Sequence, residues 1–173
     1  MCCELVLIRL REATGKIKNG VLFESPTTTD FVHLDTFTSE TLIAMDRFKE
    51  FLAAKTFAVA GASIQTQKYG NKVFRALLSA GCETYPINPK ESVIEGHQAY
   101  KSLIELPVVP ESLSIVTPPE VTRQVVADAI TAGVKHIWMQ PGAEDEQAAE
   151  AARLAEIDVI DDGSCVLVLL ARQ

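Results

Sequence analysis

The sequence predicts a single α/β domain of three layers, in which a doubly wound, mostly parallel sheet of five strands lies between two layers of helices. Three observations support this class. Short apolar runs alternate with helical periods from residue 45 onward, and such alternation implies parallel βαβ units. The run at residues 57–62 is apolar throughout, as in a strand buried on both faces. All five segments that follow the runs carry Gly or Pro, which turn the chain sharply.

The individual elements follow from these patterns in chain order. We expect strands at residues 57–62, 84–87, 113–116, 136–139 and 158–160, and helices at residues 45–54, 70–80, 119–132 and 144–156. The inward positions are Val73, Phe74, Leu77 and Leu78 in the second helix, and Val121, Val125, Val126, Ala129 and Ile130 in the third. Gly81 and Gly133 stand where the caps that end these two helices are expected. Right-handed crossovers then place helices on both faces of the sheet.

Residues 1–44 lack the regular alternation of strand and helix patterns and are expected to form an irregular N-terminal extension to the domain at residues 45–173. They contain one candidate short strand, at residues 5–10, and then a stretch rich in turn-forming residues. Met45 would open a complete domain by itself, so two alternatives stay open. Residues 1–44 either precede the natural start of the protein, or they form a genuine strand or arm that pairs with a neighbour.

Composition and charge disfavour several classes of function. The chain has 173 residues and a formal net charge of -7, which argues against nucleic-acid binding because phosphate contacts need clustered Lys and Arg. The four cysteines show no spacing typical of a metal site, and no apolar run approaches the ~20 residues of a membrane span. Because the N-terminus lacks a signal-peptide pattern, we expect a cytoplasmic protein with reduced thiols.

In such sheets, ligands bind at the carboxyl ends of the strands, near the point where strand order reverses. The first loop there, residues 61–71, begins with Gly61-Ala62-Ser63, whose small residues let the backbone approach a phosphate. The helix that follows directs its free N–H groups and positive dipole end to the same place. The Ser63 hydroxyl would add a donor, and Lys68 or Lys72 a charge. A plain strand-to-helix turn is the alternative for this loop taken alone.

The second loop narrows the class of ligand. NAD-binding proteins usually place Asp or Glu after the second strand to hold the ribose hydroxyls, whereas this chain has Asn88-Pro89-Lys90 there. A cation without a carboxylate suits a ribose that carries a phosphate, as in NADP and coenzyme A (CoA). The alternative is that Asn-Pro merely ends the strand.

Six short motifs together resemble one known family. They are Val59-Ala60-Gly61-Ala62-Ser63, Lys68-Tyr69-Gly70-Asn71, Tyr85-Pro86-Ile87-Asn88-Pro89-Lys90, Ala99-Tyr100-Lys101-Ser102-Leu103, Thr117-Pro118-Pro119 and Ile137-Trp138-Met139-Gln140-Pro141-Gly142. In residues, order and spacing, the chain over residues 55–166 resembles the small CoA-binding family, whose Rossmann-like fold matches the nucleotide-binding domain of the succinyl-CoA synthetase α subunit.

The resemblance implies CoA as the cofactor and suggests a role for each matching residue. Gly61, Ala62 and Ser63 would contact the pyrophosphate. Asn88, Pro89 and Lys90 would hold the adenosine ribose and its 3′-phosphate. Ser102 and Leu103 would lie along the adenine side. Thr117, Pro118 and Pro119 would line the channel of the pantetheine arm, where Pro offers a rigid wall. Lys68 and Tyr69 complete the candidate set, and no residue is assigned to catalysis or to a metal.

The chain departs from the family pattern at two edges of the expected pocket. Members often carry Arg before the paired prolines, where this chain has Val116-Thr117, and Asp-Arg-Cys after the last strand, where it has Asp161-Asp162-Gly163-Ser164-Cys165. Cys165 is expected near the reach of the CoA thiol. A mixed disulfide is one interpretation of it, and simple packing is the favoured one. The apolar tail at residues 166–170 either packs back on the sheet or marks an interface between subunits, as in a homodimer.

The leading hypothesis is therefore a stand-alone, non-catalytic module that binds CoA or a short acyl-CoA as a sensor or carrier. The full acyl-CoA ligases that share this domain use a phosphorylated histidine from a further domain, together with a nucleotide-grasp domain, and the chain is too short for either. Its own His97 and His136 lack an oriented partner in the sequence. Two rivals stay open: an NADP-binding redox protein, and a subunit of a larger acyl-CoA ligase.

Overall fold

The structure is a computed structural model that describes residues 39–171, with side chains from residue 46 onward. The candidate strand at residues 5–10 lies outside the described residues. Within the described part of the chain, no helix has the length and apolar character needed to cross a membrane.

Five parallel strands form the main sheet in the order β2-β1-β5-β6-β7. Their bounds are β1 Thr56–Ala60, β2 Glu83–Ile87, β5 Ser112–Ile115, β6 His136–Met139 and β7 Asp158–Ile160. The chain places β2 on one side of β1 and then returns to build β5 on the other side, so strand order reverses between β1 and β5. The predicted parallel, doubly wound sheet is confirmed, and each strand lies within two residues of its predicted bounds.

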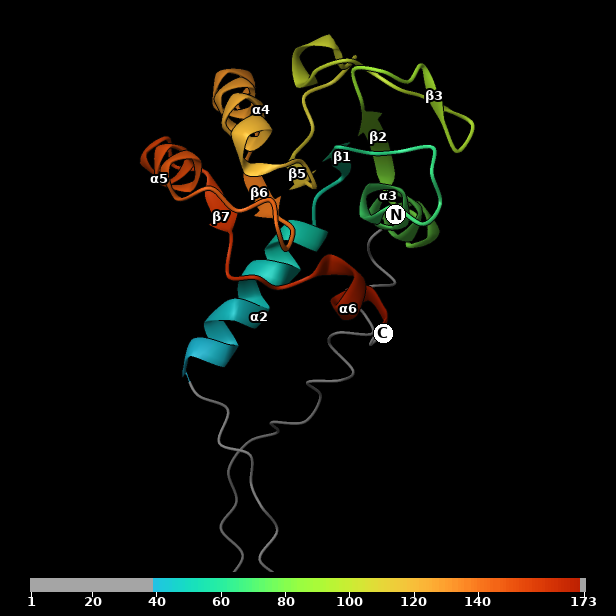
Figure 1. The fold of residues 1–173 in the computed structure, drawn as a ribbon. Coiled ribbons are helices and arrows are strands. Elements are labelled where there is room, and N and C mark those ends of the chain that lie inside the picture. The colour runs from blue at the N-terminus through green and yellow to red at the C-terminus, as the bar shows by residue number, and fades with distance from the viewer. Residues whose placement is uncertain (1–38, 172–173) are drawn as a thin grey trace, which may run out of the picture.

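Helices cover both faces of the sheet, which confirms the three layers (Figure 1). Their bounds are α2 Ser39–Leu52, α3 Tyr69–Ser79, α4 Pro119–Ala132, α5 Glu146–Leu154 and α6 Val166–Ala171. Successive side chains of a strand point to opposite faces, so Phe57 and Trp138 pack in one apolar cluster with side chains of α2, α3 and α6. Ala58 and Ile137 pack in a second cluster with side chains of α4 and α5.

The ends of the helices follow local chemistry that the sequence shows. Gly81 and Gly133 follow α3 and α4 with φ angles of 79° and 82°, as expected of glycine just past a helix. Helix α5 begins at Glu146 rather than at the predicted residue 144, because the Asp145 carboxylate caps it by accepting from the Ala148 N–H. One inward position was wrong: Val121 is 45% exposed. Its neighbour Thr122 takes the buried face, about 100° around the helix.

Helix α2 begins six residues before the predicted start at residue 45 and ends two residues before the predicted end. Residues 39–44 contain neither Gly nor Pro, so nothing in the local sequence stops the helix from extending backward. Its described apolar side chains enclose Trp138: the ring of Phe48 stacks on the indole at 5.0 Å, and that of Phe51 meets it edge-on at 5.1 Å. These contacts bury Trp138 completely.

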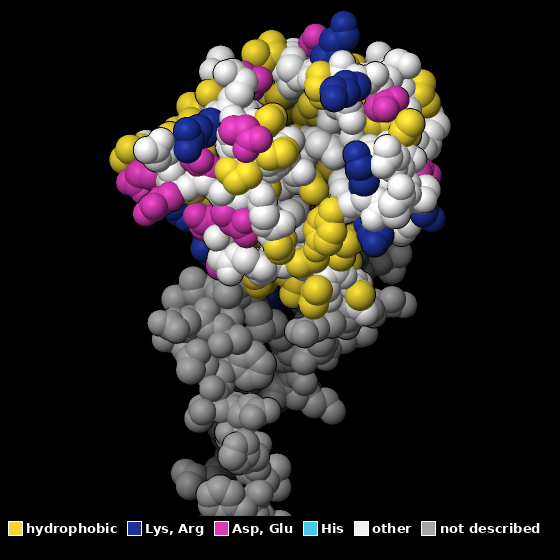
Figure 2. Space-filling view, in the orientation of Figure 1, with side chains coloured by type: hydrophobic (Ala, Val, Ile, Leu, Met, Phe, Trp, Pro, Cys, Tyr) yellow, Lys and Arg dark blue, Asp and Glu magenta, His cyan; other side chains and the backbone are white. Residues whose placement is uncertain are grey.

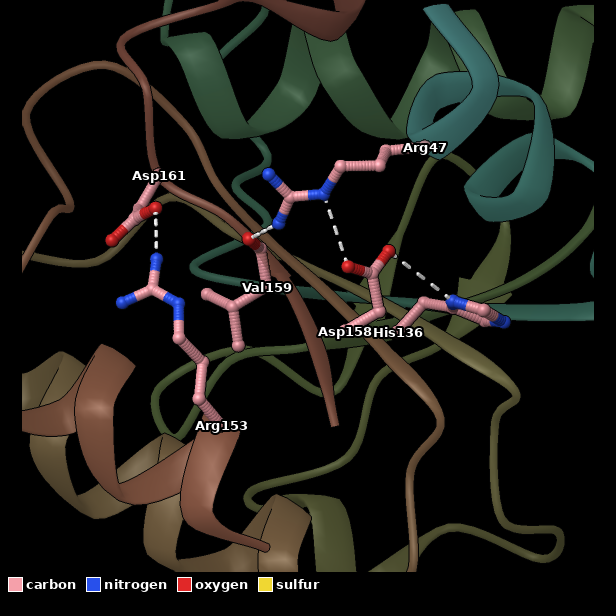
Figure 3. Close-up of polar contacts among 6 residues, drawn as sticks. All are labelled: Arg47, His136, Arg153, Asp158, Val159 and Asp161. Atoms are coloured by element: carbon pink, nitrogen blue, oxygen red, sulfur yellow. Dashed lines mark hydrogen bonds and ion pairs between the residues drawn. The ribbon is translucent and has the colours of Figure 1, made fainter. Parts of the chain in front are cut away.

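A polar contact also fastens α2 to the sheet, at the amino ends of β6 and β7 (Figure 3). The Arg47 Nε donates to Asp158 Oδ1 at 3.1 Å, and its guanidinium also donates to the carbonyl oxygen of Val159. The second carboxylate oxygen of Asp158 lies 3.7 Å from His136 Nδ1. One arginine therefore links the helix to the last strand.

The sequence did not predict three short elements. They are the antiparallel hairpin of β3 Val93–Ile94 and β4 His97–Gln98, the single 3₁₀ turn η1 Leu103–Glu105, and helix α6. Strands of two residues carry too little periodicity to be read from sequence. Tertiary contact stabilises the hairpin, because Ile94 is fully buried in the cluster that contains α3.

The apolar C-terminal tail forms α6, which packs against α3. Val166 is fully buried, and Leu167, Leu169 and Leu170 pack in part against the same cluster, so the expectation that the tail packs back on the sheet side is confirmed. Val168 remains 48% exposed, and hydrophobic side chains gather on the surface over α6 (Figure 2). An interface between subunits at this surface stays a prediction.

Candidate functional site

The carboxyl ends of β1 and β5 meet at the switch point of the sheet, and the first loop begins there at Gly61. Its N–H donates to the carbonyl of Ile87, which ends β2. Gly61 has a φ of 88°, and a Cβ added to it would lie 3.0 Å from the Val116 carbonyl oxygen and 3.2 Å from Thr117 Cγ2. Both the conformation and the space therefore require glycine, because the backbone of the first loop lies against the loop that follows β5.

The first turn of α3 lies against the same loop. A Cβ added to Gly70, the second residue of α3, would lie 2.0 Å from the Gly61 carbonyl oxygen. No side chain caps this end of α3, so its first-turn N–H groups are left for a ligand or solvent. With the positive end of the helix dipole added, this junction has the features of an anion-binding site for a phosphate group.

The polar atoms of Ser63 form hydrogen bonds that hold the conformation of the first loop. Ser63 is 9% exposed, and its hydroxyl oxygen accepts from the Gln65 N–H at 3.1 Å. The hydroxyl proton is still able to donate to a ligand. The carbonyl oxygen of Ser63 accepts from Asn71 Nδ2 at 2.7 Å. The predicted donor is therefore present, in a loop whose conformation is held by two hydrogen bonds.

The sequence analysis did not place Asn71 among the site residues, although it lies in one of the motifs. It is fully buried, and its Nδ2 donates both to Ser63 and to Glu95 Oε1, the latter at 2.7 Å. Glu95 lies in the turn between β3 and β4. Asn71 thus connects the first loop, the first turn of α3 and the hairpin. Its position one residue after an obligatory glycine was the signal available in the sequence.

The second loop is joined to the first by Asn88. The Asn88 Nδ2 donates to the Ala62 carbonyl at 2.7 Å, and its Oδ1 accepts from the Lys90 N–H at 2.8 Å. Asn88 therefore holds the first and second loops together, and its side chain forms a turn with the Lys90 N–H. Pro89 and Lys90 are exposed, which leaves the lysine side chain at the surface beside the junction.

The third loop leads directly into α4. Pro118 precedes the helix and Pro119 is its first residue, where proline fits because the first N–H of a helix has no partner in it. The hydroxyls of Thr117 and the buried Thr122 lie 2.9 Å apart. The Thr117 methyl group lies close to Gly61, as described above, so two of the expected binding segments are in contact.

The remaining candidates lie around this junction at different depths. Tyr100 bridges Ile87, which brings Ser102 and Leu103 to the side of the second loop. Ser102 is half-buried, whereas Leu103 is 4% exposed and packs in the core. Lys68 and Tyr69 are exposed at the start of α3, and the Tyr69 hydroxyl contacts the sulfur of Cys165.

The described part of the chain contains two histidines, His97 and His136. His136 is the first residue of β6, at the amino ends of the strands and therefore at the opposite end of the sheet from the junction. It faces Asp158 (Figure 3). His97 is exposed on the hairpin, with its ring edge-on to that of Phe74 at 5.6 Å. Among the residues that the structure describes, no group of three or more His, Cys, Asp or Glu side chains is placed to hold a metal ion.

The structure is thus a doubly wound α/β domain with a candidate anion site at the switch point of its sheet. Residues 55–171 match the family model described as a CoA binding domain, and the chain belongs to that family. A curated relative, subunit alpha of the ADP-forming acetate–CoA ligase II from Pyrococcus furiosus, is 32% identical over 104 residues, which are 60% of this chain and 23% of that protein. The chain thus spans less than a quarter of the length of the curated relatives it matches.

Two solved structures resemble almost the whole described domain. A conserved hypothetical protein from Pyrococcus furiosus is 39% identical with a TM-score of 0.62, over 66% of this chain and 97% of that chain. A hypothetical protein from Pyrococcus horikoshii is 26% identical with a TM-score of 0.70, over 84% of this chain and 98% of that one. The resemblance predicted from the motifs is confirmed.

Proposed function

We propose that this chain binds CoA or a short acyl-CoA at the Gly61–Gly70 junction, as a stand-alone module that senses or carries the ligand without catalysing a reaction. The observation that supports it most is the contact of the first turn of α3 with the first loop, where a Cβ on Gly70 would lie 2.0 Å from Gly61 O. A junction this close brings the loop against the uncapped backbone N–H groups of the helix end, which suits a pyrophosphate. It occurs in a chain that belongs to the CoA binding domain family.

The second loop supports a ligand with a phosphate on its ribose. Asn88 uses both ends of its amide to hold Ala62 and Lys90 in place. The exposed Lys90 follows, and no carboxylate stands at this position to accept from two ribose hydroxyls. The proposed role of Lys90 is to pair with the 3′-phosphate of CoA.

The lengths of the relatives bear on the stand-alone role. In the two solved structures above, the matching region makes up 97% and 98% of the chain. The curated ligase relatives, by contrast, contain it as 23% and 16% of their length. A second candidate follows from the ligases: this chain would be one subunit of an acyl-CoA ligase, with the catalytic parts on a partner.

Calorimetric titration with CoA, acetyl-CoA, dephospho-CoA, NADP and NAD tests the ligand class. We expect CoA to bind at micromolar strength or tighter, which corresponds to about 8 kcal/mol or more, and NAD to bind much more weakly. Dephospho-CoA lacks only the 3′-phosphate, so its loss of affinity measures what Lys90 and its surroundings recognise. Preference for NADP over CoA would overturn the proposal in favour of a redox protein.

Variants locate the site. We expect Ser63→Ala to weaken all CoA derivatives, because it removes a donor beside the pyrophosphate. Lys90→Ala should weaken CoA by about five- to ten-fold, as for a partly exposed charge pair worth ~1 kcal/mol, and leave dephospho-CoA unchanged. Lys55→Ala, which removes the same charge at the amino end of β1, is the matched control. If Lys90→Ala weakens both ligands equally, the 3′-phosphate assignment is wrong.

Co-purification separates the module from the ligase subunit. We expect the tagged chain expressed in its native cell to be recovered without a stoichiometric nucleotide-grasp partner, and to retain CoA binding by itself. Recovery of such a partner, together with nucleotide-dependent acyl-CoA formation by the pair, would establish the second candidate instead.

A further inference from the structure

The loop after β7 lies at the carboxyl ends of the strands, the same end of the sheet as the candidate site. It begins at Asp161, which is held by Arg153 of α5 (Figure 3), and it ends at Cys165, immediately before α6. The sulfur of Cys165 contacts the hydroxyl of Tyr69, the first residue of α3. The thiol therefore lies beside the same helix end that forms the proposed pyrophosphate site, and it is partly exposed.

The Tyr69 hydroxyl and the Cys165 sulfur are in hydrogen-bond contact. Burial, together with the hydrogen bond and charge interaction with Cys165, raises the pKa of Tyr69 to about 12. Either group is able to donate while both carry a proton, and once Cys165 is a thiolate the hydroxyl is the donor. A donated O–H and the N-terminal end of a helix both stabilise negative charge placed beside them.

A second, independent feature beside Cys165 is a buried amide that lacks an acceptor. Gln140, which follows β6, is fully buried, and its Oε1 accepts from the Val166 N–H at 3.0 Å. Its Nε2 is buried without a hydrogen-bond partner among the described residues. An unpaired buried donor is unfavourable, so an acceptor such as an amide carbonyl of a ligand would be favoured there.

The order of the strands arranges these groups in a row. Across β1, β5, β6 and β7, the carboxyl ends present in turn Gly61, Thr117, Gln140 and the loop to Cys165. Three strand spacings separate β1 from β7 by ~14 Å, and Cys165 lies within this span because the loop after β7 brings it to Tyr69. The pantetheine arm of CoA contains about as many chain atoms as four peptide residues, which extend over ~14 Å. An arm that starts at the pyrophosphate can therefore bring its thiol to Cys165.

We infer that Cys165 is a site of covalent attachment for CoA through its thiol, and that Gln140 orients the arm by donating to one of its amide carbonyls. This inference rests on the proposed CoA binding. The reaction is thiol–disulfide exchange with a disulfide of CoA as the co-reactant. The Cys165 thiolate attacks one sulfur of that disulfide, so a Cys165–CoA bond forms and the original S–S bond breaks. The second half leaves as a CoA thiolate, which takes up the proton that Cys165 lost.

The experiment compares two disulfides on the reduced full-length protein by intact mass and peptide mapping. With CoA disulfide we expect a mass increase of one CoA less two hydrogens, located at Cys165. We expect it to form about ten-fold or more faster than the adduct with cystamine, which lacks the nucleotide, because binding raises the effective concentration of the attacked sulfur. The other cysteines are internal controls that should not prefer CoA disulfide.

Two variants extend the test. Cys165→Ser should abolish the rapid adduct. Gln140→Met should slow the reaction with CoA disulfide while leaving that with cystamine unchanged, an effect that general damage to the fold would not produce. Equal rates with the two disulfides in a protein that binds reduced CoA would overturn the attachment site but leave the proposed function intact. Absence of calorimetric CoA binding would overturn both.

Discussion

Replacing Gly70 with alanine changes one methyl group at the point where α3 meets the first loop. In an ordinary helix this change stabilises by about 1 kcal/mol, because alanine has the higher helix propensity. Here the new Cβ would lie 2.0 Å from Gly61 O and 2.9 Å from Gly61 C, whereas real Cβ atoms essentially never approach within 3.0 Å. The two atoms are backbone, so the helix and the loop must separate by about 1 Å. Overpacking of this kind destabilises by roughly 1–3 kcal/mol.

We therefore expect Gly70→Ala to lower the free energy of unfolding by about 2 kcal/mol, and the melting temperature by roughly 4–8 °C. The loss of binding free energy for CoA should exceed the loss of unfolding free energy, because the separation opens the proposed pyrophosphate site. Urea denaturation and calorimetric titration measure the two effects. Ser79→Ala, at the exposed last residue of the same helix, is the control and should change little. A Gly70→Ala protein that is as stable as wild type or more stable would refute the close approach.

Three further predictions concern the contacts that hold the site and the layers together. Asn71→Asp should lower the free energy of unfolding in urea by about 2–4 kcal/mol, because a carboxylate cannot donate to Ser63 O or Glu95. Glu95→Gln keeps an acceptor for Asn71 and should stay near wild type. Equal losses of stability in the two variants would contradict the assignment. Arg47→Met should destabilise by about 1–2 kcal/mol by freeing α2 from Asp158 and Val159 (Figure 3), whereas Lys49→Met, which removes only the exposed pair with Asp46, should change the urea midpoint little. The Ala148 N–H, and next the Arg123 guanidinium, lower the pKa of Asp145, so its charge stabilises the fold above the ordinary carboxyl pKa and loses that effect as pH falls through the lower folded-state pKa. The stability difference between wild type and Asp145→Asn, which keeps the cap, should be constant near neutral pH and vanish in acid; a difference that persists in acid would argue against the charge.

The predictability of the site differs from residue to residue. Gly61 was identified from local sequence alone, because a glycine directly after a buried strand indicates a tight turn and a close approach. Asn88 was identified by its place in the second loop, but its observed contacts are with Ala62 and Lys90 of the protein itself. Such a role needs a partner 26 residues away, which no local pattern reveals. The contacts of the candidate residues with a ligand stay predictions.

Asn71 and Gln140 show the limit more clearly. Each is a polar residue, and sequence patterns treat such a residue as facing solvent. Both are fully buried, and hydrogen bonds from distant segments compensate for part of the loss of water. Asn71 binds Glu95 of the hairpin, and Gln140 binds the backbone of Val166. Only the folded chain brings these pairs together.

By itself, the sequence determined the class of fold, the five parallel strands, the ends of α3 and α4, and the loops that form the candidate site. These features follow from hydrophobic periodicity and from the conformations that glycine and proline allow, and both are local properties of the chain. Tertiary structure alone decided that β1 and β5 are neighbours, that the hairpin and α6 form, and that Tyr69 meets Cys165. Those outcomes depend on contacts between residues far apart in the chain, whose free energy is gained only once the sheet and its two layers have packed.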